Sequence, residues 1–218
     1  MKTALLSTAY FGPVQWFQKV NRYDLAIVDE RESFLKQTYR NRCIIATANG
    51  PQALTVPVER GATGDISSLR ISDHGNWRHI HWNALCSAYG ESPFFDYYED
   101  DVRPFFEERW EYLCDYNMAI ARKMCELLQV KEPVSTADVG PVDVSSVADF
   151  RSLIRPKHAE PDAEFEARPY WQVFGQKNGF LPNLSVLDLL FNMGNEAVLY
   201  LEERYKGHKG EKRGEKGL

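Results

Sequence analysis

Cysteine is scarce in this 218-residue chain, and the cysteines present follow no metal-binding or disulfide pattern. The four of them form no Cys-x-x-Cys pair and are irregularly spaced, at Cys43, Cys86, Cys114 and Cys125. Zinc sites with cysteine ligands and disulfide frameworks both depend on regular spacing. We therefore expect reduced thiols in a cytoplasmic protein.

A long hydrophobic run and an excess of positive charge are also missing. The N-terminal apolar stretch is interrupted by Gln15 and Lys19 well before it reaches the length of a membrane span, so we expect neither a signal peptide nor a transmembrane helix. The formal net charge is −5, and Lys and Arg are scattered, which argues against nucleic-acid binding. The hydrophobic share of 44% is ample for a packed core.

Motifs for familiar cofactor and metal chemistry are likewise absent. The sequence has no Gly-x-Gly-x-x-Gly, no Walker loop, no Gly-x-Ser-x-Gly elbow and no His-Glu-x-x-His. His74, His79 and His81 have a spacing that does not bring three imidazoles to one helical face. We therefore predict no metal site, and the sequence leaves the cofactor open.

The N-terminal part predicts a β-α-β unit. Residues 3–7 and 25–29 are apolar runs typical of buried strands, and the helix expected over 14–20 begins just after Pro13. This order of strand, helix and strand is typical of a parallel pair. Further strands are expected over 42–46, 53–58 and 69–72, with a hairpin-like turn at 49–51.

The hydrophobic period becomes helical in the second half. Helices are expected over 77–89, 93–98, 102–130, 185–192 and 195–205, the last two joined at Gly194. Residues 132–169 have weak periodicity and predict an irregular crossing segment or a mobile lid, and residues 206–218 predict a disordered tail. The predicted fold is α/β bordering α+β: a β-α-β unit in a small mixed sheet, packed by a helical C-terminal half, in one domain over 1–205.

The most charged motif is the segment 36–42, Lys-Gln-Thr-Tyr-Arg-Asn-Arg. A strand there would point Lys36, Arg40 and Arg42 to one face and Asn41 to the other. Such a strand is typical of a solvated sheet edge. Alternatively it forms a rim that binds an anionic small molecule, because guanidinium groups bind phosphates and carboxylates with two hydrogen bonds.

His81 is a candidate general base because it lies beside Trp77 and Trp82. A neutral imidazole there could take a proton from a sugar stacked on an indole ring. The alternative is a histidine whose hydrogen bonds are satisfied inside an aromatic core.

A second polar group lies in the apolar segment 180–191. Ser185 and Asp188 match a capping box, which predicts a helix start with Asp188 facing back toward it. Asn183, Ser185 and Asp188 would be partly buried there and would need partners. Asp188 could pair with Arg40 or Arg42, and the group could serve either structure or catalysis.

Five segments together resemble the WbqC-like protein family. They are TAYFGPVQWF at 8–17, KQTYRNR at 36–42, LTVPV at 54–58, AYGESPFF at 88–95 and GFLPNLSVLDLLFN at 179–192. The resemblance implies a bacterial cytoplasmic protein of O-antigen or other surface-polysaccharide synthesis. It also implies a role in placing an acyl or aminoacyl group, such as glycine, on an amino sugar.

The first functional hypothesis is therefore an enzyme that transfers an acyl or aminoacyl group to a nucleotide-linked amino sugar. Arg40 and Arg42 would bind phosphate or carboxylate, Lys36 would add charge, and His81 would accept the amine proton. Asp188 is the second candidate catalytic residue. The other candidate substrate contacts are Tyr10, Gln15, Asn41, Trp82, Asn183 and Ser185.

Two alternatives stay open at this point. One is a nucleotidyl-transfer enzyme in which the turn over 10–15 holds an activated phosphate at the start of the first helix. The other is a non-catalytic scaffold of polysaccharide assembly that recognises its partner through exposed aromatic rings. The rings considered for that role are Trp77, Trp82, Tyr97 and Tyr98. The oligomeric state is left open.

Overall fold

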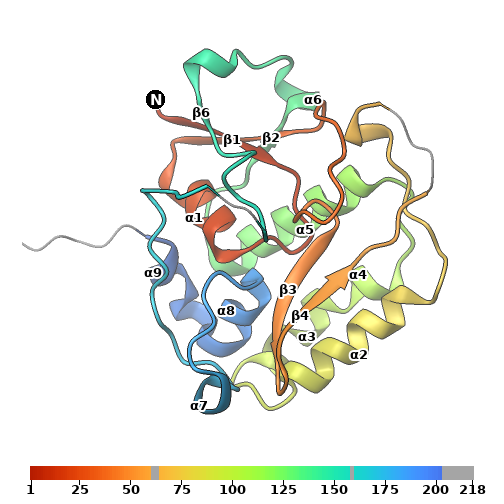
Figure 1. Cartoon of the computed structure of the whole chain (residues 1–218), viewed down its shortest axis with the longest axis vertical. Coiled ribbons are helices and arrows are strands. Elements are labelled where there is room, and N and C mark those ends of the chain that lie inside the picture. Colours follow the sequence, from red (N-terminus) through yellow and green to blue (C-terminus); the bar gives the residue numbers. More distant parts are fainter. Residues whose placement is uncertain (60–63, 158–159, 203–218) are drawn as a thin grey trace, which may run out of the picture.

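The predicted β-α-β unit is present in the computed structural model, which describes residues 1–59, 64–157 and 160–202 (Figure 1). Strand β1 (Thr3–Ser7) leads through helix α1 (Val14–Arg22) to strand β2 (Leu25–Asp29). The two strands are parallel, with Thr3 opposite Leu25 and Ser7 opposite Asp29. Their central residues are buried, as expected for a parallel sheet covered on both faces.

Two short strands from the irregular segment complete this sheet. Strand β5 (Val134–Ser135) pairs with β2, and β6 (Ala148–Asp149) pairs with β1. The order is β5-β2-β1-β6, and every pair is parallel. Between them lie α6 (Thr136–Val139) and the 3-10 turn η2 (Val144–Ser146). Strands of two residues leave no periodic pattern, so the sequence does not indicate them.

A separate antiparallel hairpin follows. Strands β3 (Arg42–Thr47) and β4 (Gly50–Thr55) pair from Arg42 with Thr55 to Thr47 with Gly50. Gly50 has a φ of 98°, which favours glycine in this turn. The strand expected over 53–58 thus begins earlier, because pairing starts at the turn. The strand expected over 69–72 is wrong, since Ile71 forms only an isolated bridge with Val58.

The single helix predicted over 102–130 is also wrong. The 3-10 turn η1 (Ile66–Ser68) and α2 (Trp77–Tyr89) are followed by α3 (Phe95–Val102), α4 (Pro104–Glu107) and α5 (Leu113–Leu128). Pro104 opens a new helix because it has no N–H to donate. Before α5 the chain is extended: the amide of Ile71 donates to Glu111 O at 2.9 Å, and that of Leu113 to Leu69 O at 2.9 Å.

The C-terminal part packs against α1 and the hairpin. It contains α7 (Gly175–Asn178), α8 (Val186–Met193), η3 (Gly194–Glu196) and α9 (Ala197–Leu201). Helix α8 is buried from Val186 to Asn192, and it touches α1, α3 and β3. The predicted tail over 206–218 and the end of the helix expected over 195–205 lie outside the described residues.

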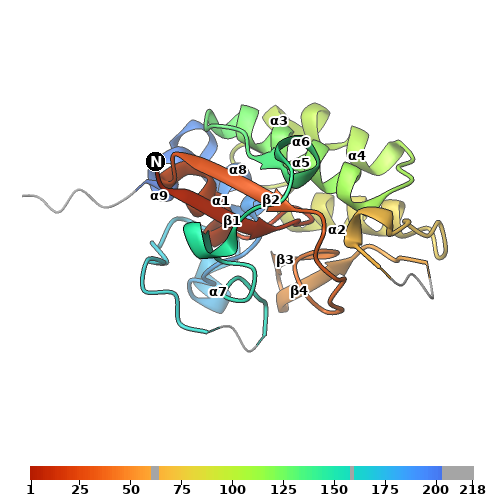
Figure 2. The same ribbon diagram turned by 90° about the horizontal axis from the view of Figure 1, so that it is seen from above.

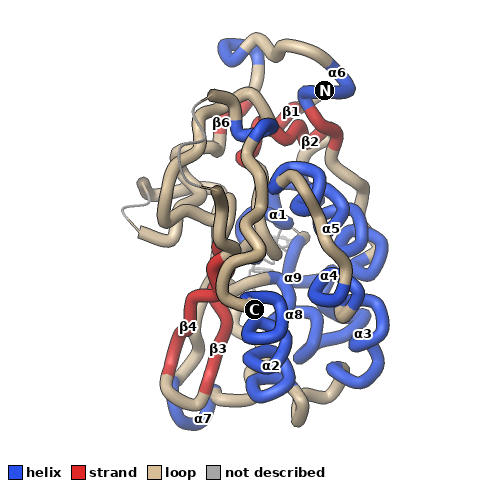
Figure 3. The backbone as a smooth tube through the Cα atoms, turned by 90° about the vertical axis from the view of Figure 1, so that its right-hand side faces the viewer, coloured by secondary structure: helices blue, strands red, loops and turns tan. Residues whose placement is uncertain are grey.

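The elements divide into two regions. The β3–β4 hairpin lies apart from the parallel sheet, beside α2 and α8 (Figures 1 and 3). Seen from above, α3, α4 and α5 gather on the side of the molecule opposite the hairpin (Figure 2). The expected fold class, α/β bordering α+β, is confirmed, with parallel and antiparallel strands in two separate sheets.

Candidate functional site

The carboxyl ends of the parallel strands define the candidate site. Strands β1, β2 and β6 end at Ser7, Asp29 and Asp149, and their parallel pairing brings these residues to one edge. The chain leaves β1 to form β2 on one side, and β6 joins β1 on the other side. In open parallel sheets, ligands bind in the crevice outside the carboxyl ends at such a change of direction.

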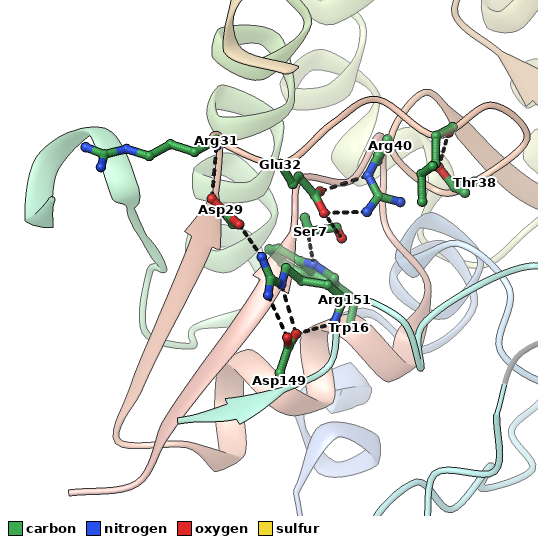
Figure 4. A network of polar contacts seen from close by, with 10 residues as sticks. Ser7, Trp16, Asp29, Arg31, Glu32, Thr38, Arg40, Asp149 and Arg151 are labelled. Atoms are coloured by element: carbon green, nitrogen blue, oxygen red, sulfur yellow. Dashed lines mark hydrogen bonds and ion pairs between the residues drawn. The ribbon is translucent and has the colours of Figure 1, made fainter. Parts of the chain in front are cut away.

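Six polar side chains meet at this edge, and we call them the carboxyl-edge cluster (Figure 4). They are Ser7, Asp29, Glu32, Arg40, Asp149 and Arg151. The cluster combines three carboxylates with two guanidinium groups and one hydroxyl. It can therefore offer hydrogen-bond donors to an anion and acceptors to an amine or a hydroxyl.

Arg151 joins two strand ends across β1. Its Nε and Nη2 donate to the two carboxylate oxygens of Asp149 at 3.0 and 2.7 Å, and its Nη1 donates to Asp29 Oδ2 at 2.5 Å. These hydrogen bonds lower the pKa of Asp149, against the opposing effect of burial, and they raise the pKa of Arg151. Both side chains are partly exposed, Arg151 to 25% and Asp149 to 31%, so a ligand can reach them.

Arg40, by contrast, is neutralised within the chain. Its Nε donates to Glu32 Oε1 at 2.8 Å and its Nη2 pairs with Glu32 Oε2, which also accepts a hydrogen bond from Ser7 Oγ at 3.2 Å. The two side chains are exposed to only 3% and 9%. Two-point pairing of this kind fixes the guanidinium plane. Arg40 is therefore a buried member of the cluster, and it holds Glu32 in place.

Of the segment 36–42, only Arg42 lies in a strand, and the charged residues do not form one rim. Residues 36–41 make turns, with Gln37 in the left-handed region at a φ of 61°. Lys36 is exposed, Asn41 donates to Val56 O at 2.8 Å, and Arg42 Nε donates to Thr55 Oγ1 at 3.0 Å. Without a strand, the two-residue alternation that would align them is absent.

Gln15 and Asn183 are two predicted substrate contacts. They lie side by side, but their polar groups form hydrogen bonds with each other. The amide of Gln15 donates to Asn183 Oδ1 at 2.9 Å, and Asn183 Nδ2 donates to Gln15 Oε1 at 3.0 Å. The amide of Val14 donates to Leu184 O at 3.0 Å. The first N–H groups of α1, where the nucleotidyl-transfer alternative requires a phosphate, are thus hydrogen-bonded within the chain.

A buried ion pair adjoins this contact. Lys19 is 1% exposed and lies 2.9 Å from Asp162 Oδ2, and it also contacts Glu164 at 3.2 Å. Gln15 Nε2 donates to the same Asp162 oxygen at 2.9 Å. The Lys19 ammonium group lies 4.3 Å from the centre of the Phe150 ring. These contacts attach the segment around Asp162 to helix α1.

His81 and Tyr10 form a buried pair. Their Nδ1 and hydroxyl oxygen are 2.9 Å apart, and His81 is 4% exposed. Burial lowers the pKa of His81 to about 4, against an opposing hydrogen bond with the backbone of Thr55. Burial also raises the pKa of Tyr10. The imidazole is therefore neutral at pH 7 and already has partners within the core.

Asp188 is fully buried and accepts three hydrogen bonds. The donors are Tyr170 OH at 2.6 Å, Gln172 Nε2 at 2.8 Å and Tyr89 OH at 2.9 Å. Burial raises the pKa of Asp188, and the three hydrogen bonds oppose that rise. The predicted pairing with Arg40 or Arg42 is wrong, because neutral donors satisfy the carboxylate.

Ser185 caps α8, as the sequence predicts. Its Oγ accepts from the amide of Leu187 at 3.3 Å and donates to Phe11 O at 2.8 Å. The reciprocal half of the capping box is absent. The amide of Ser185 donates to Ile44 O at 2.7 Å, while Asp188 turns away from the helix start.

Trp82 lies in a different place from the cluster. It is half-buried and lines a cleft of about 440 Å³, together with His79 rather than His81. Of the rings considered for a scaffold surface, Trp77 and Tyr98 are buried and Tyr97 is 73% exposed. These four rings therefore do not form one exposed aromatic patch.

Of the cluster, the sequence indicated Arg40, and sequence reasoning missed Ser7, Asp29, Glu32, Asp149 and Arg151. Asp29 could have been found, because a polar residue that ends a buried strand marks the carboxyl edge of a sheet. Asp149 and Arg151 follow a strand of two residues in the weakly periodic segment. No pattern in the sequence predicts that strand.

Among residues 1–59, 64–157 and 160–202, no group of three or more His, Cys, Asp or Glu side chains is arranged to hold a metal ion. Within the same ranges, no helix combines the length and the apolar character that crossing a membrane requires.

The fold and the cluster define an α/β protein with a charged edge at the carboxyl ends of a small parallel sheet. The chain belongs to the WbqC-like protein family, whose model matches residues 8–153. All members of the cluster except Ser7 lie within the match. The resembling segment 179–192 lies beyond it.

A relative is found in Mycobacterium tuberculosis (strain ATCC 25618 / H37Rv), where it has the name Uncharacterized protein Rv1507c. The two chains are 27% identical over 230 residues, which cover 92% of this chain and 97% of the relative. No solved structure matches this chain.

Proposed function

We propose that the protein is an enzyme of surface-polysaccharide synthesis that transfers an acyl or aminoacyl group to a nucleotide-linked amino sugar. The observation that carries this proposal is the carboxyl-edge cluster, which combines partly exposed groups of both charges at the edge where parallel sheets bind ligands. Membership of the WbqC-like family supports a role in surface-polysaccharide synthesis.

The charges of the cluster match those of the proposed substrate. A nucleotide-linked amino sugar carries phosphates on its anomeric carbon and an amine on another carbon of the same pyranose ring. Arg151 can bind a phosphate oxygen through the exposed part of its guanidinium group. Asp149 can accept a hydrogen bond from the amine, since its lowered pKa keeps it ionised.

The proposed reaction needs no protein nucleophile. The sugar nitrogen bonds to the carbonyl carbon of the donor, and the bond from that carbon to a thiolate or phosphate leaving group breaks with its electron pair. The nitrogen becomes acidic once it has bonded to the carbonyl, so an ionised carboxylate can collect its proton. We assign that role to Asp149, and we assign His81 to the core.

The test is binding followed by product analysis. The purified chain is screened by thermal shift against UDP-linked amino sugars, with coenzyme A thioesters or with ATP and glycine. A ligand at about 100 times its Kd stabilises the folded state by about 2.7 kcal/mol. We expect stabilisation by an amino-sugar nucleotide and a product whose mass has increased by the acyl group.

The matched variants are Arg151→Lys and Arg31→Ala. Arg151→Lys keeps the charge but loses the planar fork, so the nucleotide-sugar should bind at least about tenfold more weakly. Arg31 is exposed and points away from the cluster (Figure 4), so Arg31→Ala should bind normally. Equal affinity of the Arg151→Lys variant and the unchanged protein would contradict the proposal.

A further inference from the structure

A cavity at the C-terminal end of α8 has the composition of a carbohydrate site. Its volume is about 500 Å³, which falls in the range of roughly 300–1,000 Å³ usual for ligand sites. The lining residues are Pro93, Phe94, Trp171, Asn192, Met193, Asn195 and Glu196. Trp171 lies four residues before Gly175, the first residue of α7, and α7 lies at the lower end of the molecule in Figure 1, away from β1, β2 and β6.

Two large aromatic rings at this cavity face solvent. Trp171 is 54% exposed and Phe94 is 37% exposed. A ligand that covers an exposed indole removes apolar surface from water, which favours binding. A pyranose ring has a face of C–H groups that packs on an aromatic ring, and hydroxyl groups around its rim.

The buried Asp188 holds Trp171 in its outward position. Tyr170 and Gln172, on either side of Trp171, both donate to Asp188 Oδ2 at 2.6 and 2.8 Å. Gln172 also exchanges hydrogen bonds with the backbone of Leu181 at 2.9 and 3.0 Å. With both neighbours fixed inward, the backbone at Trp171 is held in place and its side chain lines the cavity.

The second ring is fixed by a glycine. The amide of Phe94 donates to Phe191 O at 3.1 Å, and the ring lies against Gly194. A Cβ at Gly194 would lie 2.7 Å from the Phe94 ring, and the φ of 55° also favours glycine. The Phe94 ring and the backbone of Trp171 are therefore positioned before any ligand binds, which lowers the entropic cost of binding.

Polar groups at the cavity match hydroxyl groups and exclude anions. Asn192 lines the cavity, but its amide group is buried and its Nδ2 donates to Asp188 O at 2.7 Å, so the exposed Asn195 and Glu196 are the polar side chains that a ligand can reach. Asn195 accepts from Tyr98 OH at 3.2 Å through Oδ1, so its Nδ2 can donate to a ligand. The described lining includes Glu196 but no Lys, Arg or His, which disfavours a phosphate.

We propose that this cavity binds a neutral hexopyranose, stacked on Trp171 and hydrogen-bonded by Asn195 and Glu196. The site is separate from the carboxyl-edge cluster and does not depend on the proposed transfer reaction. Asp188 acts in it as a positioning residue.

The test is saturation-transfer NMR on the full chain with N-acetylglucosamine and glucose at millimolar concentrations. The phosphomonoester of N-acetylglucosamine at its anomeric carbon serves as the anionic comparison. We expect saturation of the ring protons of a neutral sugar and a weaker effect for the phosphate ester. Absence of transfer to both neutral sugars would overturn the proposal.

Matched variants distinguish binding at this site from non-specific binding. Trp171→Ala should lose at least about tenfold in affinity, equivalent to about 1.4 kcal/mol, whereas Trp171→Phe should retain part of it. Tyr97→Ala removes an exposed ring outside the cavity and should bind like the unchanged protein. Equal signals from Trp171→Ala and the unchanged protein would overturn the proposal, as would self-association that Trp171→Ala abolishes.

Discussion

At the residue scale, burial decides which polar side chains are able to meet a ligand. His81 and Asp188 have the chemistry of catalytic groups, but both lie in the core with partners from distant parts of the chain. Arg151 and Asp149 are ordinary charged residues in sequence, yet the fold leaves them partly exposed at a sheet edge. Exposure is set by tertiary packing, which residue type alone does not reveal.

His81 should make the free energy of unfolding depend on pH. Its pKa is about 4 in the folded state against 6.5 for the unperturbed group. The unfolded chain therefore binds more protons between these values, and stability falls as pH drops from 6.5 toward 4. The contribution is about 3 kcal/mol at most.

Urea denaturation over this pH range checks the prediction. The His81→Gln variant should show a flatter pH profile than the unchanged protein. His79→Gln is the control, because His79 is exposed and its loss should leave the profile intact. Parallel profiles for His81→Gln and the unchanged protein would show that His81 does not titrate in this way.

At the element scale, the irregular segment is attached to the core by specific contacts. It supplies both outer strands of the parallel sheet, and Asp162 bonds to Lys19 and Gln15 of α1. The segment thus brings Asp149 and Arg151 to the candidate site. Of the two interpretations made from its composition, these contacts favour the crossing segment over the lid.

Asp162→Asn should destabilise the protein by about 3 kcal/mol, because it leaves the buried Lys19 ammonium without its main partner. Chemical denaturation measures the loss, and amide exchange should quicken around residues 150–170. Glu164 supplies the other carboxylate near Lys19, and its side chain is 58% exposed. Glu164→Gln should therefore lower the free energy of unfolding by less than about 1 kcal/mol. Equal losses in the two variants would contradict this assignment.

At the scale of the whole molecule, the two proposed ligand sites occupy different regions. The carboxyl-edge cluster lies at the parallel sheet, and the aromatic cavity lies where α8 ends near α3. No cluster residue lines the cavity. Effects of changes at distant sites without shared partners usually add.

Binding at the two sites should therefore be independent. Arg151→Lys should weaken the nucleotide-sugar and leave the NMR signal of the neutral sugar intact, and Trp171→Ala should do the reverse. Titration calorimetry of both single variants and the double variant measures the coupling, which should be below about 0.5 kcal/mol. A larger coupling would mean that the two regions form one extended site.

The sequence by itself determined the local elements and the family. Apolar runs and turn residues predict β1, α1, β2 and α2 because hydrophobic period and helix ends are local properties. The same locality explains the error over 102–130, where the apolar spacing continues although Pro104 and the backbone pairing of Glu111 interrupt the helix. Five segments in order were enough to indicate the WbqC-like family, which the comparison confirms.

Only the tertiary structure decided which charged residues meet. Asp29 comes from a different part of the chain than Asp149 and Arg151, and parallel pairing of short strands brings them to one edge. Trp171 likewise faces out because its two neighbours donate hydrogen bonds to Asp188, which lies on α8. Such contacts depend on packing between distant segments, and no local pattern in a single sequence specifies that packing.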